Sequence, residues 1–302
     1  MASIWQLTAI VFPSKTIVLG VILDGANKTS GISSAKLSSA IEIAKSYFKS
    51  TRSGDKVSVK WKGVEQSAET DSHGFFALTA DHPFSGNQNP EILLNGMPLT
   101  YEKEVLNVYT VRENHNLIIS DIDDTVVVSH TNKRFKSIMT TLFTTYMERK
   151  PVTSTSKIFD ALGEGYDIVY VSRSEYNLFP LLSNFMKHHK IPRGPLFLTP
   201  FISFRELLRN RKDPDFKIKT INLLLEHSNH KQIVLVGDDT QHDLQVYAEI
   251  ARIYGARIRK IFIRQTDLRQ DRRHSSEWKE LDHYVHNMVY FHDATDFSML
   301  DY

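Results

Sequence analysis

The chain has 302 residues, of which 41% are hydrophobic and 24% charged, the balance of a globular protein with room for one large domain or two ordinary ones. Its formal net charge of +2 is too small for the basic tract of a nucleic-acid-binding protein or for a polybasic membrane clamp. The sequence contains no cysteine, which excludes disulfides and thiolate metal sites and is compatible with a reducing compartment.

The amino-terminal segment is apolar but does not follow the pattern of a signal peptide. It lacks a basic start, and Lys15 interrupts its hydrophobic run. The sequence has no stretch of about 18 apolar residues, so we expect no transmembrane helix. The expected location is the cytoplasm, with the protein either free or bound peripherally to a membrane.

Residues 1–113 follow mostly the two-residue hydrophobic period of β-strands. The expected strands are "TIVLGVILDG", "DKVSVKW" and "FFALTA", with a turn over residues 71–74 before the last. A single helix is expected where Leu37, Ile41, Ala44 and Phe48 form one apolar stripe. This pattern indicates a small β-rich sandwich or barrel domain. It carries no evident catalytic constellation, which favours a scaffold.

From residue 114 to residue 302 the pattern changes to short apolar runs that alternate with helical stretches. The expected strands are "LIIS", "DIVYVS", "LFL", "QIVLVG" and "KIFI". The expected helices are "EYNLFPLLSNFMKHH", "FKIKTINLLLEH" and "LQVYAEIARIYG". Strand and helix in alternation predict an α/β domain with a parallel sheet and helices on both faces.

Polar residues follow three of these predicted strands directly. Ligands of open parallel sheets bind beyond the carboxyl ends of the strands, so we expect these side chains to meet in one crevice. They are Asp121, Asp123, Thr125, Ser172, Asp238, Asp239 and Asp243.

The carboxylates in this set predict a metal site. Asp121 and Asp123 are two residues apart, so on an extended chain their side chains point the same way. Clustered carboxylates repel one another unless a cation cancels their charge, and Asp238 and Asp243 enter the same crevice. Oxygen ligands without histidine or thiolate suit Mg²⁺. We therefore expect Mg²⁺ to be held by Asp121, Asp123, Asp238 and Asp243.

This arrangement suits phosphoryl transfer. A metal-bound carboxylate can attack phosphorus to give an aspartyl phosphate, while its neighbour exchanges protons with the leaving alkoxide and with water. The phosphoryl oxygens need donors and positive charge, which Thr125, Ser172 and a lysine would supply. Lys217 and Lys219 are both candidates. Helical spacing places Lys217 on the apolar stripe that packs on the sheet, which favours it over Lys219.

The motif set resembles a known superfamily. D-x-D-x-T, a strand-end serine, a helix lysine and G-D-x-x-x-x-D, in that order, are similar to the haloacid dehalogenase phosphotransferases. The segments "SDIDDT", "YVSRSEYNLFPLLSNFM", "PRGPLFL" and "LVGDDTQHDLQVYAEI" resemble the actin-patch type of phosphatidate phosphatase, which is related to lipins. This resemblance covers about residues 115–265. Residues 35–80 are similar to the β-rich region that precedes the domain in bacterial relatives.

The resemblance implies a haloacid dehalogenase-like catalytic domain and a role for each matching residue. Asp121 matches the nucleophile, and Asp123 matches the acid/base that also lends a backbone carbonyl to Mg²⁺. Ser172 and Lys217 match phosphate-binding groups. Asp238 matches a metal ligand, and Asp243 a second or more distant one. The implied reaction is the hydrolysis of phosphatidate to diacylglycerol and phosphate.

The superfamily also implies a cap over the site. The segment "RFKSIMTTLFTTYMERK", residues 134–150, has apolar residues at helical spacing and sits where the cap is found. The short interval between Thr125 and the next strand makes this cap small, leaving the crevice open to a bulky or membrane-held substrate. Ordinary packing on the sheet explains the same apolar stripe equally well.

Several alternatives remain open. The enzyme alternative is a generic phosphomonoesterase that acts on a soluble or protein substrate. The non-enzymatic alternative is a lipid- or phosphate-sensing module, against which the presence of Asp121 argues. The basic run at 264–278 suits either contact with anionic lipid heads or a solvated loop.

Other polar residues near the motifs have an ordinary interpretation. Asp124 and Asp239 are interpreted as solvated or hydrogen-bonding neighbours rather than ligands. His242 is interpreted as making a structural hydrogen bond, since Mg²⁺ disfavours imidazole. Arg173 and Asp239 depart from the small or polar residues usual at their positions in the family, which puts the identity of the substrate in question.

Overall fold

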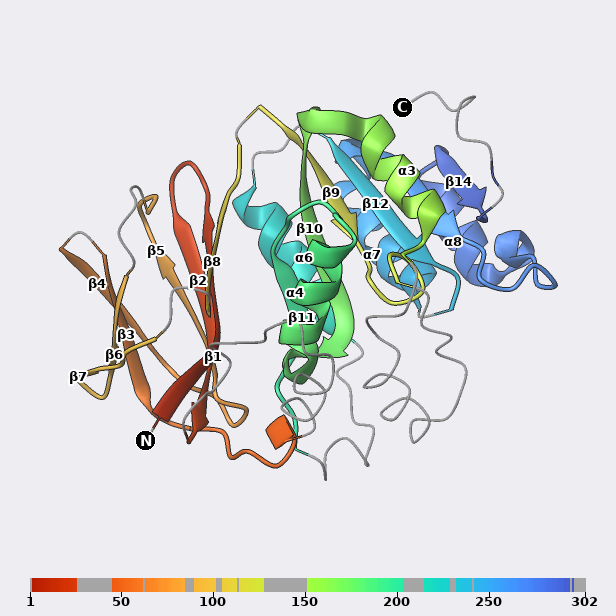
Figure 1. Cartoon of the computed structure of the whole chain (residues 1–302). Helices are drawn as coiled ribbons and strands as arrows, with labels where there is room; N and C mark the ends of the chain where they lie inside the picture. The colour runs from red at the N-terminus through yellow and green to blue at the C-terminus, as the bar shows by residue number, and fades with distance from the viewer. Residues whose placement is uncertain are drawn as a thin grey trace. The chain divides into compact units, whose positions relative to one another are not determined.

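The computed structural model describes residues 2–25, 45–61, 63–84, 90–101, 105–112, 114–127, 151–203, 215–228, 232–240, 242–293 and 295. The chain forms two compact units, whose elements Figure 1 labels. Unit 1 comprises Met1–Arg112, Glu175–Ser183 and Leu198–Lys212, and unit 2 comprises Glu113–Ser174, Asn184–Phe197 and Asp213–Tyr302.

Unit 1 contains two four-stranded sheets. The first has the order β5, β2, β1, β8 and is built from β1 (Ala2–Val11), β2 (Thr16–Asp24), β5 (Phe75–Ala80) and β8 (Leu106–Thr110). The second has the order β4, β3, β6, β7 and is built from β3 (Lys56–Trp61), β4 (Val64–Glu69), β6 (Glu91–Leu94) and β7 (Met97–Pro98). Antiparallel pairing joins these strands, except that β1 and β8 are parallel.

Side chains from both sheets share one hydrophobic cluster, which includes Leu7, Val57 and Phe76. Within this cluster, Trp61 stacks on Phe84 with 4.4 Å between the ring centroids. Gly20 is required for close packing, because a Cβ there would lie 2.5 Å from the ring of Phe76. Two sheets that share a core give unit 1 the layered form that the alternating sequence pattern indicates.

The three strands expected in this half are confirmed as β2, β3 and β5. The turn before β5 forms because the Asp71 carboxylate accepts hydrogen bonds from the backbone N–H groups of His73 and Phe75, and Gly74 takes a positive φ of 69°. The expected helix lies mostly outside the described residues. Phe48, assigned to its apolar stripe, has 74% of its surface exposed, so that assignment is wrong for this residue.

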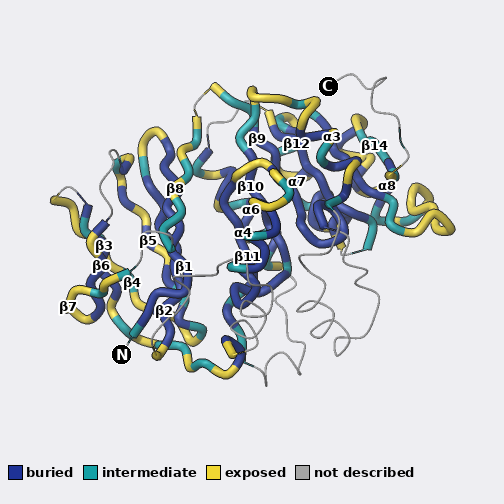
Figure 2. Tube along the Cα trace, viewed as in Figure 1, coloured by how far each residue is buried: buried dark blue, intermediate teal, exposed yellow. Residues whose placement is uncertain are grey.

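Unit 2 is organised around one six-stranded sheet with the order β11, β10, β9, β12, β13, β14. Its strands are β9 (Asn116–Ser120), β10 (Tyr166–Glu175), β11 (Leu196–Thr199), β12 (Ile233–Asp238), β13 (Ile258–Arg264) and β14 (Met288–Phe291). Every neighbouring pair from β10 to β14 is parallel. The central strands are almost wholly buried (Figure 2). Because they are parallel, their carboxyl ends lie at one edge of the sheet.

Helices alternate with these strands, which confirms the α/β prediction. They are α3 (Thr153–Leu162), α4 (Phe179–His188), α6 (Phe216–His227), α7 (Asp243–Tyr254) and α8 (Ser276–Tyr284). All five expected strands and the three expected helices form, whereas α3, α8 and β14 were not predicted. The predicted cap at 134–150 lies outside the described residues.

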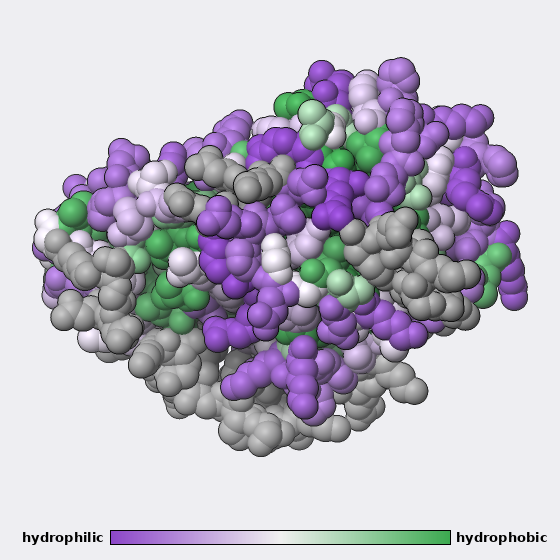
Figure 3. Space-filling view, turned by 90° about the horizontal axis from the view of Figure 1, so that it is seen from above, coloured by the Kyte–Doolittle hydropathy of each residue, from purple (hydrophilic) through white to green (hydrophobic). Residues whose placement is uncertain are grey.

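The described surface is mostly hydrophilic in the view of Figure 3, with small separate apolar patches. Among the helices that the structure describes, none combines the length and apolar composition needed to span a bilayer.

Candidate active site

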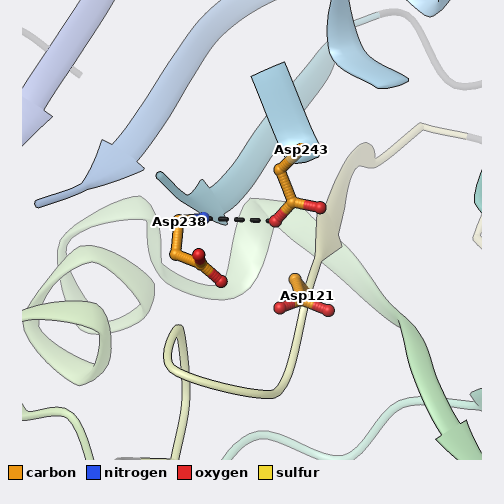
Figure 4. A group of neighbouring side chains, drawn as sticks. All are labelled: Asp121, Asp238 and Asp243. Atoms are coloured by element: carbon orange, nitrogen blue, oxygen red, sulfur yellow. Dashed lines mark hydrogen bonds between the residues drawn. The ribbon is translucent and has the colours of Figure 1, made fainter. Parts of the chain in front are cut away.

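Three aspartates meet at the carboxyl edge of the sheet in unit 2. Asp121 directly follows β9, Asp238 ends the adjacent strand β12, and Asp243 begins α7. One carboxylate oxygen from each lies within 4.8 Å of the others, and all three side chains are buried. Figure 4 shows the three carboxylates facing a common point. Adjacent parallel strands therefore bring together residues more than a hundred positions apart in the sequence.

The path of the chain from β12 into α7 places Asp243. Its Oδ2 accepts a hydrogen bond of 3.2 Å from the backbone N–H of Asp238, drawn as a dashed line in Figure 4. A Cβ at Gly237 would lie 2.6 Å from the same oxygen and 2.8 Å from the hydroxyl of Tyr247. Glycine at this position lets the Asp243 carboxylate and the Tyr247 ring approach the strand, and Tyr247 donates to the Val236 carbonyl at 2.8 Å.

A buried lysine bridges two of the carboxylates. The Nζ of Lys217, on α6, lies 2.7 Å from Asp121 Oδ1 and 2.5 Å from Asp243 Oδ1. Burial alone would lower the pKa of Lys217, but the two carboxylates outweigh burial and raise that pKa, so the ammonium stays charged. Lys219 is exposed on the same helix. The structure therefore brings Lys217 to the aspartates and leaves Lys219 at the surface.

The cluster holds more negative charge than this lysine cancels. Burial raises the pKa of Asp121 well above its ordinary value; Lys217 opposes this rise, and Asp243 and Asp238 add to it. Burial, followed by repulsion from Asp243, raises the pKa of Asp238 to about 7. Three buried carboxylates around one ammonium are therefore under electrostatic stress that a further cation would relieve.

Asp123 faces a different part of the site. Its Oδ2 accepts hydrogen bonds from the hydroxyls of Ser172 at 3.0 Å and Ser174 at 2.7 Å, both on β10. The chain turns from Ile122 onward, where the N–H groups of Thr125, Val126 and Val127 donate to the Ile122 carbonyl, so it does not continue as the extended segment assumed from the sequence. The side chain of Asp123 points to β10, while that of Asp121 points to Lys217.

Thr125 lies at the junction of the two central strands. Its Oγ1 is 3.5 Å from Asp121 Oδ2 and 3.4 Å from Asp238 Oδ2, at the limit of hydrogen-bond distance. The other oxygen of Asp238 accepts from both the backbone N–H and the hydroxyl of Thr240. Asp121 and Asp238 therefore present their Oδ2 atoms toward the same place.

Comparison with known proteins identifies this part of the chain. A model of the catalytic domain of phosphatidate phosphatase APP1 matches residues 116–265. The matched segment is just under half of the chain and contains Asp121, Lys217, Asp238 and Asp243. The buried cluster therefore lies within an APP1-type domain.

Two curated fungal proteins are similar to the chain. An uncharacterised protein of Schizosaccharomyces pombe is 28% identical over 212 residues, covering 67% of this chain and 34% of the relative. Phosphatidate phosphatase APP1 of Saccharomyces cerevisiae is 26% identical over 191 residues, covering 62% of this chain and 30% of the relative. The chain spans about a third of the length of these relatives.

Among solved structures the likeness is weak. The Pnkp1/Rnl/Hen1 complex matches with a TM-score of 0.33 and 11% identity over 66% of this chain and 54% of that one. A likeness of this size carries no conclusion about the fold.

The APP1-type domain uses some polar residues as supports rather than as members of the cluster. Asp239 accepts hydrogen bonds of 2.6 Å from the hydroxyls of Thr266 and Tyr290, away from the three aspartates. The ring of His242 is exposed and lies 3.0 Å from Gln245. Both arrangements agree with the structural interpretation drawn from the sequence.

Sequence reasoning missed three groups that act on the site residues. Ser174 is two positions after Ser172, so strand periodicity places both hydroxyls on one face. Thr240 is two positions after Asp238 and caps its carboxylate. The third, Arg264, gives no such local signal, because its partners Asp124 and Asp293 are far from it in the sequence.

A first prediction concerns stability of the metal-free protein. The folded-state pKa of Asp238 is about 7, above its ordinary value of 3.8. At a pH between these two values, the folded state keeps a proton on Asp238 that the unfolded state has released. This contribution to the free energy of unfolding is full below the ordinary pKa and is lost as the pH rises through about 7. In EDTA, melting temperatures at pH 5 and pH 8 should therefore differ less for Asp238→Asn than for the wild type.

Asp282→Asn, at an exposed position, is the control for this comparison. Equal pH dependence in wild type and Asp238→Asn would contradict the electrostatic account.

Proposed function

We propose that the chain is a Mg²⁺-dependent phosphatidate phosphatase that forms an aspartyl phosphate on Asp121. The observation that carries the proposal is the buried set of Asp121, Asp238 and Asp243 around Lys217, within the segment that matches the APP1 catalytic domain. The parallel sheet with acidic groups at its carboxyl edge supports a haloacid dehalogenase-like fold. In this proposal residues 114–302 carry the chemistry, and residues 1–113 form the separate β-rich domain.

The donor set fits Mg²⁺. A divalent cation would bring three carboxylates and one ammonium to electrical neutrality, and oxygen atoms are the ligands that Mg²⁺ prefers. Asp121 Oδ2 and Asp238 Oδ2 are the oxygens best placed to hold it, because Lys217 and Thr240 engage the others. The family resemblance adds the backbone carbonyl of Asp123. When bound, the ion would keep the carboxylates ionised and draw charge from the phosphoryl oxygens.

Asp243 is better suited to an indirect role than to metal ligation. Its Oδ1 accepts from Lys217 and its Oδ2 from the backbone of Asp238, so both oxygens already serve structural contacts. In this role Asp243 fixes the lysine beside the nucleophile.

The chain's own groups account for each bond change. A carboxylate oxygen of Asp121 bonds to phosphorus as the bond to the ester oxygen breaks, and Asp123 gives that oxygen its proton. Asp123 then takes a proton from the water that attacks the phosphorus, which releases phosphate and restores Asp121. Lys217, Thr125 and Ser172 bind the phosphoryl oxygens, and Ser174 keeps the carboxyl of Asp123 oriented when Ser172 turns to phosphate.

The nucleophile gives the second prediction. Asp121→Asn removes the attacking oxygen's charge while keeping the shape of the side chain, so phosphate release should fall by about 10³-fold or more. The melting temperature of the metal-free variant should be at least that of the wild type, because repulsion among the buried carboxylates falls while Asp243 still pairs with Lys217. Phosphate release with Mg²⁺ and thermal unfolding measure the two effects. Undiminished turnover would rule out Asp121 as the nucleophile.

The two lysines of α6 give the third prediction and a matched pair. Lys217→Met should lower phosphate release by about 10²-fold or more, because it removes the ammonium beside Asp121. Lys219→Met changes an exposed residue on the same helix and should leave the rate within roughly twofold. Steady-state kinetics on both variants distinguishes them. If Lys219→Met were the damaging change, the assignment of the phosphate-binding lysine would be reversed.

A loop at the edge of the site supports a lipid substrate and a peripheral membrane location. Gln265 follows β13, and the side chain of Gln265 donates to the carbonyl of Gln270 at 2.8 Å, which closes a tight loop. Leu268 at its tip is 71% exposed, and the neighbouring Arg269 and Arg272 are exposed as well. An apolar tip beside cationic side chains suits the interface of an anionic membrane.

Substrate form gives the fourth prediction. The wild type should release phosphate faster from phosphatidate in phosphatidylcholine vesicles than from p-nitrophenyl phosphate. Leu268→Glu should lower the vesicle rate by about tenfold and leave the rate on the soluble ester unchanged, because only the first requires contact with the bilayer. Ile253→Glu, at another exposed apolar position, is the control. Preference of the wild type for the soluble ester would instead support the generic phosphomonoesterase.

A further inference from the structure

Arg264 is a buried arginine beside the catalytic turn. It ends β13, pairs in register with Asp238 and exposes only 7% of its surface, whereas the sequence placed it in a basic run of lipid-facing or solvated residues. Its Nη1 donates to the backbone carbonyl of Asp124 at 2.7 Å. Its Nε and Nη2 donate to the two carboxylate oxygens of Asp293 at 3.3 and 3.0 Å. The planar guanidinium thus joins two residues, Asp124 and Asp293, through three separate N–H groups.

The carbonyl that Arg264 holds belongs to a strained point of the chain. Asp124 lies between Asp123 and Thr125 and has a φ of 54°, in the left-handed region that non-glycine residues rarely adopt. Its N–H donates to the carbonyl of Val127 at 2.8 Å, which closes a tight turn. A residue in this conformation persists only when its surroundings hold it there, and the arginine supplies a charged hydrogen bond on the outer side of the turn.

The first turn of α3 completes the support. The hydroxyl of Thr155 donates to the carbonyl of Thr125 at 2.6 Å. The neighbouring Ser154 donates to Asp293 Oδ1 at 3.0 Å, the same oxygen that Arg264 Nε reaches. Asp293 therefore links Arg264 to α3, and these two hold consecutive carbonyls of the catalytic turn. Each contact lies within unit 2.

We propose that Arg264 is a positioning residue for the phosphoryl-transfer site. It fixes the Asp124 carbonyl and thereby the turn that begins at Ile122 and carries Asp123 and Thr125. The inference rests on the proposed phosphatase function for its kinetic consequence, but the hold on the turn is a property of the fold. Lysine cannot replace this arginine fully, because one ammonium cannot reproduce the planar fork that spans Asp293 and the carbonyl.

The kinetic test compares Arg264→Ala with Arg259→Ala. Arg259 lies on the same strand at its other end and hydrogen-bonds Tyr166 and Gln232. With p-nitrophenyl phosphate and Mg²⁺, Arg264→Ala should lower kcat by about 10²-fold with KM within roughly threefold, because the turn that carries Asp123 loses its support while Lys217 and Ser172, on other elements, still bind phosphate. Millimolar guanidinium chloride should restore part of the kcat of Arg264→Ala and none for Arg259→Ala. A kcat within twofold of wild type, an equal loss in Arg259→Ala, or a loss that guanidinium does not recover would overturn the proposal.

A second readout does not depend on activity. Hydrogen–deuterium exchange of the peptide covering residues 117–127 should accelerate in Arg264→Ala and stay unchanged in Arg259→Ala. If the wild type releases no phosphate but the exchange difference appears, the phosphatase proposal fails and the structural hold survives. Unchanged exchange in Arg264→Ala would overturn the hold itself. Should Arg264→Ala not fold, Arg264→Lys and Asp293→Asn replace it. The double variant of these two changes should exchange the 117–127 peptide no faster than Arg264→Lys alone, because both changes weaken the same contact between Arg264 and Asp293.

Discussion

The ammonium of Lys217 between Asp121 and Asp243 is the interaction on which the site depends. It is buried with the carboxylates it joins, so breaking the contact would leave a buried charge without its partner. One ammonium cannot balance the three carboxylates, and this imbalance is the physical basis for expecting a divalent cation. The sheet holds the charges together because adjacent parallel strands end at the same edge.

The arrangement separates two carboxylates that the sequence places almost side by side. Asp121 faces a lysine and two further carboxylates, whereas Asp123 faces two serine hydroxyls. Different surroundings of this kind can give neighbouring acids different chemistry, and the proposed reaction uses Asp121 for attack and Asp123 for proton transfer. Asp123 lies in the turn that begins at Ile122, and Arg264 contacts this turn at the Asp124 carbonyl.

Much of this was predictable from sequence, because it follows from local rules. Apolar runs followed by aspartate located the ends of β9 and β12, and the helical stripe favoured Lys217 over Lys219. The direction of Asp123 was not predictable, because its contacts with Ser172 and Ser174 depend on how β9 and β10 pack. Arg264 was missed because its partners, Asp124 and Asp293, lie on other elements, and a buried arginine reads in sequence like an exposed one.

The most direct test of the account is the chemical state of Asp121 during turnover. Rapid acid quench of the wild type with phosphatidate and Mg²⁺, followed by borohydride reduction and peptide mass spectrometry, reports whether a phosphoryl group was bonded to that residue. The account predicts conversion of Asp121 to homoserine, dependent on both substrate and metal and absent without either. Steady phosphate release with Asp121 unmodified, or with the adduct on another residue, would contradict it.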